Sequence, residues 1–197
     1  MRTQCTDQTH TKENTMEFNY EDSGVEFKSW PKIPRDKGNT ITITEKIDGT
    51  NACVIVQDGE LVGIQSRNRL IKPGDDNMGF AFWVMENKEE LESLGDGYHY
   101  GEWAGPGIQK NPHMLENKTF YLFNTFRPHE SLPECVQQVG ILYQGVYSKE
   151  IIEDCMSTLW SCAGSAGYIP EGVIVYFHDT RTYMKDTFAN RKGKWNS

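Results

Sequence analysis

The stretch TITITEKIDGTNACVIV, residues 40–56, determines how the rest of the chain can be interpreted. Residues 40–44 alternate threonine and isoleucine with the two-residue period of a half-buried strand, and residues 52–56 form a second short β-rich run. The residues between them include Asp48-Gly49, a pair typical of a tight turn. The sequence therefore predicts two strands whose connection presents the amine of Lys46.

The amine of Lys46 is a candidate nucleophile. A lysine amine is protonated in neutral water and must lose its proton before it can attack, so neighbouring groups have to favour the neutral form. Asp58-Gly59 predicts a hairpin turn, and residues 61–64 predict the returning strand. That strand would deliver Arg67 to the same end of the sheet as Lys46.

The remaining pattern predicts an α+β fold, with mostly antiparallel sheets flanked by helices. Apolar residues at helical spacing predict one helix within residues 79–94, and residues 148–163 predict another. Further strands are expected at residues 98–103, 119–126, 172–177 and 182–185. Residues 1–17 are interpreted as a polar N-terminal tail and residues 18–197 as one domain.

Composition narrows the possible classes of protein. The 197 residues carry a formal charge of −8, the wrong sign for a protein that coats nucleic acid, although basic residues cluster at 67–72 and 181–194. The five cysteines contain no C-x-x-C pair and the five histidines show no metal-ligand spacing. No apolar run reaches membrane-spanning length, so we expect a soluble protein. We also expect it to be cytoplasmic, in keeping with the cysteine pattern, and to be a monomer.

Several further motifs follow the lysine in a fixed order. They are Arg67, the segment GEWAGPGIQKN at residues 101–111 with Glu102, the aromatic strand FYLF at residues 120–123, the segment EGVIV at residues 171–175 and the segment YMK at residues 183–185. This series resembles the covalent nucleotidyltransferase superfamily of polynucleotide ligases and capping enzymes. Within that superfamily it is most similar to the RNA ligases of the type-two, nick-sealing branch.

The resemblance implies a minimal nucleotidyltransferase (ligase adenylation) domain and assigns roles to individual residues. Lys46 would attack the α-phosphate of ATP, release pyrophosphate and form lysyl-AMP. Lys185 would lie beside the phosphates, where a second cation favours the neutral amine and stabilises the transition state. Glu102 and Glu171 would contact the ribose and organise Mg²⁺ or Mn²⁺, in part through water. The other implied nucleotide-binding residues are Arg67 and Asn51, with Phe123, Ile47 and Val173 around the adenine and Glu45 at its edge.

The predicted function is an ATP-dependent RNA ligase that transfers AMP to a 5′-phosphate end and seals that end to a 3′-hydroxyl, with RNA ends or nicked duplexes as partners. Two alternatives remain open. A minimal ATP-dependent DNA ligase would share every residue named above. A non-catalytic relative could instead bind a nucleotide or an RNA end without covalent chemistry.

The sequence departs from the family pattern at two positions. Many members carry a lysine where this chain has Tyr176, and a second lysine in the final motif where it has Thr187. The cations Arg191, Lys192 and Lys194 could compensate for this lost charge. Because 12 residues follow Lys185, we expect no C-terminal accessory domain in this chain.

Overall fold

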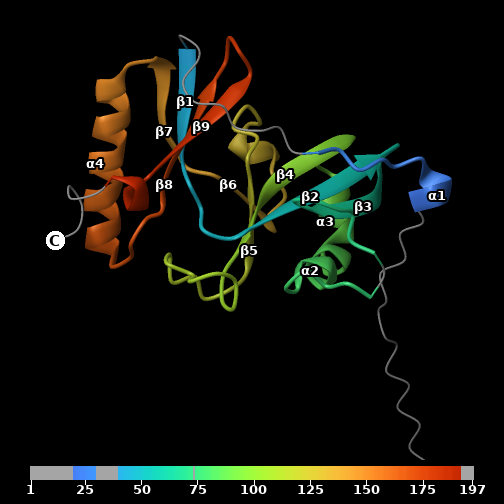
Figure 1. Cartoon of the computed structure of the whole chain (residues 1–197). Coiled ribbons are helices and arrows are strands. Elements are labelled where there is room, and N and C mark those ends of the chain that lie inside the picture. The colour runs from blue at the N-terminus through green and yellow to red at the C-terminus, as the bar shows by residue number, and fades with distance from the viewer. Residues whose placement is uncertain (1–19, 30–39, 73, 192–197) are drawn as a thin grey trace, which may run out of the picture.

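Two antiparallel-rich sheets, each covered by its own helices, make up the protein (Figure 1). The computed structural model describes residues 20–29, 40–72 and 74–191. The predicted tail, residues 1–17, lies outside these residues. Across the described residues, no helix is long and apolar enough to cross a membrane. The predicted α+β class, with mostly antiparallel sheets, is confirmed.

The first sheet, sheet A, has the strand order β7-β1-β8-β9, and all its neighbours are antiparallel. Its strands are β1 (Thr40–Glu45), β7 (Ile141–Val146), β8 (Gly172–Phe177) and β9 (Thr182–Thr187). The helix α4 (Lys149–Ala166) lies along one face of this sheet. Isoleucines and valines of β1 and β8 pack there against the apolar stripe of α4.

Helix α4 begins and ends at residues suited to those places. The side chain of Ser148 accepts a hydrogen bond from Ile151 N at 3.2 Å, and Gly167 ends the helix with a left-handed φ of 84°. Its buried residues recur at the spacing of one helix face, which is why the helix lies flat on sheet A. These residues are Ile152, Cys155, Met156, Leu159 and Ala163.

The second sheet, sheet B, has the order β3-β2-β4-β5-β6, with β5 and β6 parallel. Its strands are β2 (Thr50–Gln57), β3 (Glu60–Ser66), β4 (Gly97–Ala104), β5 (Thr119–Leu122) and β6 (Val136–Gln138). The short helices α2 (Phe80–Glu86) and α3 (Lys88–Glu92) cover one of its faces. The predicted helix within 79–94 is thus two helices that meet at Asn87.

Three short helical segments complete the described chain. These are α1 (Tyr20–Ser23), η1 (His129–Ser131) and η2 (Phe188–Asn190). The two sheets are joined where β1 runs into β2, and residues 46–49 make this turn. We call this turn, together with the strand ends beside it, the sheet junction.

Gly49 explains how β2 can start so close to β4. A Cβ at this position would lie 2.5 Å from the carbonyl oxygen of Trp103 and 2.9 Å from Cγ of Glu102. Neither separation is compatible with a side chain, so glycine permits this close approach. Gly49 therefore allows the turn that follows Lys46 to lie against β4 of sheet B.

Candidate active site at the sheet junction

Lys46 and Glu171, 125 residues apart in the chain, form an ion pair at the sheet junction. Lys46 Nζ donates to Glu171 Oε2 at 2.5 Å. The Lys46 backbone N–H also donates to the carbonyl of Gly172 at 2.9 Å, which continues the β1–β8 ladder by one residue. The two side chains are 21% and 32% exposed, so the pair is accessible to a substrate. Two residues that the sequence singled out are brought together here.

Gly172 places Glu171 in reach of the lysine. Its φ is 147°, and a Cβ there would lie 2.1 Å from the carbonyl oxygen of Asp186 in β9. Only a residue without a side chain allows this approach of β8 and β9. The glycine after Glu171 is therefore a packing requirement of sheet A.

Lys185 lies on the same face of sheet A as Lys46. Lys185 pairs with Ile174, and Ile174 pairs with Thr44, two residues before Lys46. Directly paired residues share a face, and so do residues two apart along a strand. Two strand spacings and a two-residue step separate the two lysine Cα atoms by about 12 Å. Two extended lysine side chains can approach one phosphate group from that separation.

Glu102 is buried on the sheet B side of the junction. The residue is 9% exposed, and its Oε2 accepts a hydrogen bond from Asn51 Nδ2 at 3.1 Å. Burial is the main influence and raises the pKa of Glu102 to about 7. The charge of Lys46 lowers this pKa, the charge of Glu171 raises it, and the charge of Arg67 lowers it weakly. This carboxyl therefore changes charge near neutral pH, close to the lysine.

Arg67 belongs to the same electrostatic environment. It follows β3, its side chain is exposed, and its charge lowers the pKa of Glu102. The predicted convergence of Arg67 with the Lys46 end of the sheet agrees with this arrangement. An exposed guanidinium at this place is available to phosphate or ribose oxygens.

An apolar cluster lies beside these charges, where the two sheets meet. Ile47, Ala104 and Val139 are its buried members, and Phe123 packs against it from the end of β5. Leu115 and Tyr121 complete the cluster. An aromatic ring beside aliphatic side chains provides a surface on which a purine can pack. Ile47 and Phe123, both predicted to contact a base, are therefore in one cluster.

Glu45 is fixed by two residues that the sequence did not single out. Its Oε1 accepts a hydrogen bond from Tyr168 OH at 3.1 Å and lies 2.8 Å from His113 Nε2. The rings of His113 and Tyr168 are 4.7 Å apart. Burial, followed by the nearby Glu45 carboxylate, raises the pKa of Tyr168 above its ordinary range and keeps it a donor. His113 is in a loop and Tyr168 follows α4. No local sequence pattern therefore predicted that these two side chains would contact Glu45 and each other.

Val173 requires a correction. Its side chain is fully buried and packs with β1 and α4 in the core of sheet A, so it does not contribute to the apolar cluster at the junction. Its neighbour Ile174 is on the opposite face, shared with Thr44 and Lys185. Successive strand residues point to opposite faces, so Ile174 rather than Val173 is on the face that carries Lys185.

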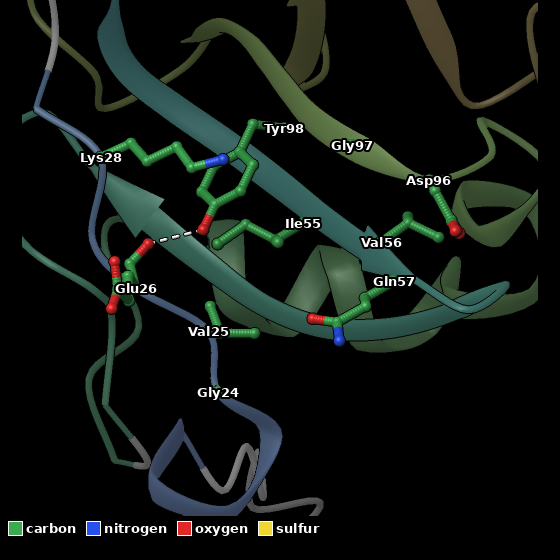
Figure 2. A pocket seen from close by; sticks show the side chains of 10 residues that line it. All are labelled: Gly24, Val25, Glu26, Lys28, Ile55, Val56, Gln57, Asp96, Gly97 and Tyr98. Atoms are coloured by element: carbon green, nitrogen blue, oxygen red, sulfur yellow. Dashed lines mark hydrogen bonds between the residues drawn. The ribbon is translucent and has the colours of Figure 1, made fainter.

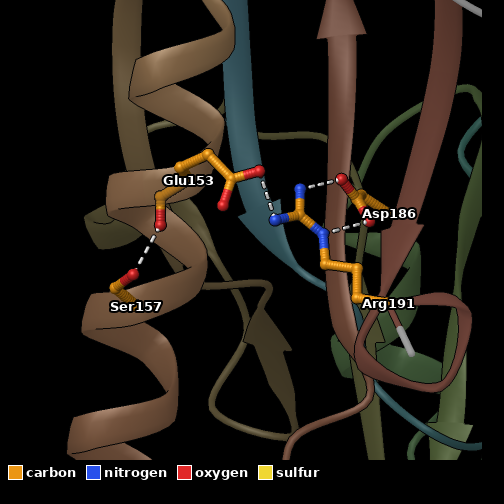
Figure 3. Close-up of polar contacts among 4 residues, drawn as sticks. All are labelled: Glu153, Ser157, Asp186 and Arg191. Atoms are coloured by element: carbon orange, nitrogen blue, oxygen red, sulfur yellow. Dashed lines mark hydrogen bonds and ion pairs between the residues drawn. The ribbon is translucent and has the colours of Figure 1, made fainter. Parts of the chain in front are cut away.

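Arg191 does not supply the charge that the sequence suggested it could. Figure 3 shows its guanidinium between β9 and α4, where it pairs with Asp186 and Glu153. Its Nε donates to Asp186 Oδ1 at 2.9 Å. These carboxylates hold Arg191 in place and tie β9 to α4, so Arg191 is a structural residue. Lys192 and Lys194 are outside the described residues.

The junction has carboxylates of a kind that can bind a metal ion together with substrate phosphates. Over residues 20–29, 40–72 and 74–191, no group of three or more His, Cys, Asp or Glu side chains could hold a metal. Mg²⁺ commonly keeps several waters and binds one or two carboxylates together with substrate phosphates. Glu171 and Glu102 are carboxylates of that kind.

A separate pocket lies at the other end of β2 and β4. It has a volume of about 410 Å³ (Figure 2). Its lining consists of Gly24, Val25, Glu26, Lys28 and Asp96 together with residues of these two strands. Lys28 lies over the ring of Tyr98, with Nζ 4.0 Å from its centroid. None of the predicted site residues lines this pocket, so it does not compete with the junction as the active site.

Comparison with known proteins shows the family of the chain and supports its fold. The family model described as RNA ligase matches residues 39–195. Among solved structures, a mutant of Naegleria gruberi RNA ligase with ATP and Mn has a TM-score of 0.59 at 20% identity, covering 81% of this chain and 53% of that one. Another mutant of that ligase, with AMP and Mn, has a TM-score of 0.59 at 19% identity, with coverages of 81% and 53%.

The same ligase with PPi has a TM-score of 0.57 at 20% identity, covering 79% of this chain and 51% of that one. The chain therefore spans about half the length of these solved structures. At such identities the likeness establishes the fold.

Proposed function

We propose, from the premise that this chain belongs to the RNA ligase family, that Lys46 is adenylylated by ATP in an RNA-joining reaction. The observation that carries the proposal is the contact of 2.5 Å between Lys46 Nζ and Glu171 Oε2 at the junction of the two sheets. This contact gives the amine an acceptor for its proton and an exposed position from which to attack.

The proposed first step uses the residues at the junction as follows. The Lys46 ammonium first gives one proton to Glu171, and the neutral amine then attacks the α-phosphorus while the bond to the bridging oxygen of pyrophosphate breaks. The second proton on the nitrogen passes to solvent as the phosphoramidate forms. Lys185, on the same face of sheet A, would neutralise charge that develops on the phosphate oxygens. Arg67 would contact phosphate or ribose oxygens from the sheet B side.

The adenine is proposed to lie against Phe123 and Ile47, with Ile174 opposite and Glu45 at the edge of the base. Asn51 and Glu102, which already share a hydrogen bond, would contact the sugar. Burial of Glu102 on this side of the junction makes an ordered contact more favourable than one made in bulk water.

A divalent cation, Mg²⁺ or Mn²⁺, would neutralise the triphosphate and assist departure of pyrophosphate. Glu171 and Glu102 would hold it, directly or through water. The Naegleria gruberi ligase structures obtained with ATP or AMP together with Mn support this part of the proposal.

Later steps would transfer AMP from Lys46 to a 5′-phosphate and join that end to a 3′-hydroxyl. RNA is proposed as the substrate because of family membership, and a nicked duplex is one form it could take. We also propose an intracellular location and a monomeric state, of which the four described free cysteines support the first.

The decisive experiment is incubation with α-labelled ATP and Mg²⁺ followed by denaturing electrophoresis. We expect acid-labile label on the intact protein and none on Lys46→Ala. Lys46→Arg keeps a positive charge without a competent nucleophile and should also stay unlabelled. An unlabelled wild-type protein that still binds ATP would favour the non-catalytic alternative, and parallel sealing assays on nicked RNA and nicked DNA would separate the two ligases.

A further inference from the structure

Four aromatic rings gather on the face of sheet A that carries Lys185. Tyr176 lies 4.7 Å from Tyr183 and 5.1 Å from His178, measured between ring centroids. Phe126 lies 5.4 Å from His178 and 6.3 Å from Tyr176, in both cases edge to face. We call these four residues the aromatic platform.

The strand register places the platform beside the proposed phosphate site. Tyr176 of β8 pairs with Thr42 of β1 and with Tyr183 of β9. Two residues earlier on β8, Ile174 pairs in the same way with Thr44 and Lys185. Tyr176, Ile174 and Lys185 therefore share a face, opposite the core residues under α4. One two-residue step along β8, about 7 Å, separates the platform from the neighbourhood of Lys185.

The platform is built from both sheets and is partly open to solvent. Phe126 comes from the loop after β5 of sheet B, yet its ring contacts rings of sheet A. It is 65% exposed, whereas His178 is held by a contact of 2.8 Å between its Nε2 and Thr42 Oγ1. A fixed set of rings beneath an exposed phenylalanine offers a π-face to a planar ligand.

We propose that the aromatic platform stacks on the terminal base of the polynucleotide whose 5′-phosphate receives AMP. The inference rests on the proposed function and specifies where the second substrate binds. The adenine of ATP has its own apolar cluster around Phe123 and Ile47, so the platform is available to a second base. A base on the platform directs its phosphate along β8 toward Lys185 and Lys46.

This assignment also accounts for Tyr176. At this position, one of the two where the sequence departs from the family pattern, the ring of Tyr176 joins three other rings. Stacking on aromatic side chains tolerates any base, because every base has a π-face. The platform thus offers a contact suited to a substrate of variable sequence.

The test measures binding of a 5′-phosphorylated single-stranded oligoribonucleotide with a 3′ fluorophore, without ATP, by fluorescence anisotropy. Phe126→Ala is expected to weaken binding about 5- to 100-fold, while Phe126→Tyr keeps a ring and retains affinity. Phe82→Ala is the matched control. Phe82 is an exposed phenylalanine, 55% accessible, but it is on α2, which covers sheet B and is not part of the platform. We expect its affinity to equal that of the wild type.

A second oligonucleotide, identical except for an abasic 5′-terminal nucleotide, identifies the stacked group. It should bind the wild type as weakly as Phe126→Ala binds the complete oligonucleotide, and Phe126→Ala should cause no further loss. Equal losses on both oligonucleotides, unchanged affinity in Phe126→Ala, or no measurable binding by the wild type would overturn the inference. Labelling of Lys46 by ATP is measured separately, so failure of the proposed function would be seen independently.

Discussion

Each side of the sheet junction has a glutamate, and the two glutamates differ in exposure and in their partners. On the sheet A side, Glu171 is partly exposed and contacts the Lys46 ammonium at 2.5 Å. On the sheet B side, Glu102 is buried, hydrogen-bonded to Asn51, and has a pKa raised to about 7. The comparison teaches that the two glutamates suit different parts of the proposed reaction: the exposed side presents the charges that would react, and the buried side would hold the nucleotide in a fixed orientation.

Removing the carboxylate on the exposed side is expected to have the largest effect. Glu171→Gln keeps the size of the side chain but removes the acceptor of the Lys46 proton, so the rate of self-adenylylation should fall about 10²- to 10³-fold. Single-turnover labelling with α-labelled ATP measures this rate. A rate close to that of the wild type would show that the ion pair only maintains the resting structure.

The buried side predicts a pH-dependent effect on stability. Glu102 has a folded-state pKa of about 7 against an ordinary value of 4.5. Between these values the folded state binds the proton more tightly than the unfolded state, so this residue lowers stability as pH rises from 4.5 to 7. Glu102→Gln cannot titrate and should gain about 3 kcal/mol relative to the wild type across this window.

Urea unfolding of both proteins at pH 4.5, 6 and 7.5 measures this difference directly. Carboxylates elsewhere titrate in both proteins and cancel in the comparison. A difference in the free energy of unfolding that stays constant with pH would contradict the asymmetry between the two glutamates.

Lys185 tests how far the exposed side extends along sheet A. Lys185→Ala should raise the KM for ATP about 10- to 100-fold, because one charged phosphate contact is lost. The side chain is exposed, so the fold should be retained, and circular dichroism checks this. Lys149→Ala, an exposed lysine at the start of α4, is the matched control and should leave the KM unchanged. Equal KM values for the two variants would remove Lys185 from the site.

The smallest expected effect concerns the edge of the base. Tyr168→Phe removes one of the two donors to Glu45 while keeping the ring beside His113. If these donors orient an acceptor toward the amino group of adenine, the preference for ATP over GTP should fall about fivefold, as expected for one hydrogen bond. Competition between labelled ATP and unlabelled GTP measures it. Loss of stability with the preference intact would assign these contacts to the fold alone.

Local patterns predicted much of the fold, since strand period and turn residues identified β1 to β4, β8 and β9 near their observed ends. They did not predict β6 and β7, or the break between α2 and α3 at Asn87. The motif series also indicated the residues that form the junction, including the pair Lys46 and Glu171. The meeting of two distant residues such as these can be predicted from motifs, because the proposed chemistry needs both side chains at one site. Local strand or helix patterns carry no such information.

The errors have a common physical cause. Strand β8, GVIVYF, is apolar on both faces, so its sequence does not reveal which side chains point toward the junction, and Val173 was chosen in place of Ile174. The contacts of Glu45 with His113 and Tyr168 depend on three segments meeting in space. Arg191 was likewise assigned from its charge alone, without its partners on β9 and α4.

The separation of 125 residues between Lys46 and Glu171 has a consequence for biogenesis. During synthesis the lysine emerges long before its acid partner, and the two meet only after β8 inserts beside β1 in the middle of sheet A. Contacts between such distant parts of a chain form late and slowly. If Lys46 is adenylylated as proposed, nascent or truncated forms that end before β8 would lack its acid partner and would not acquire AMP. Acquisition of the AMP label would then report that the chain has finished folding.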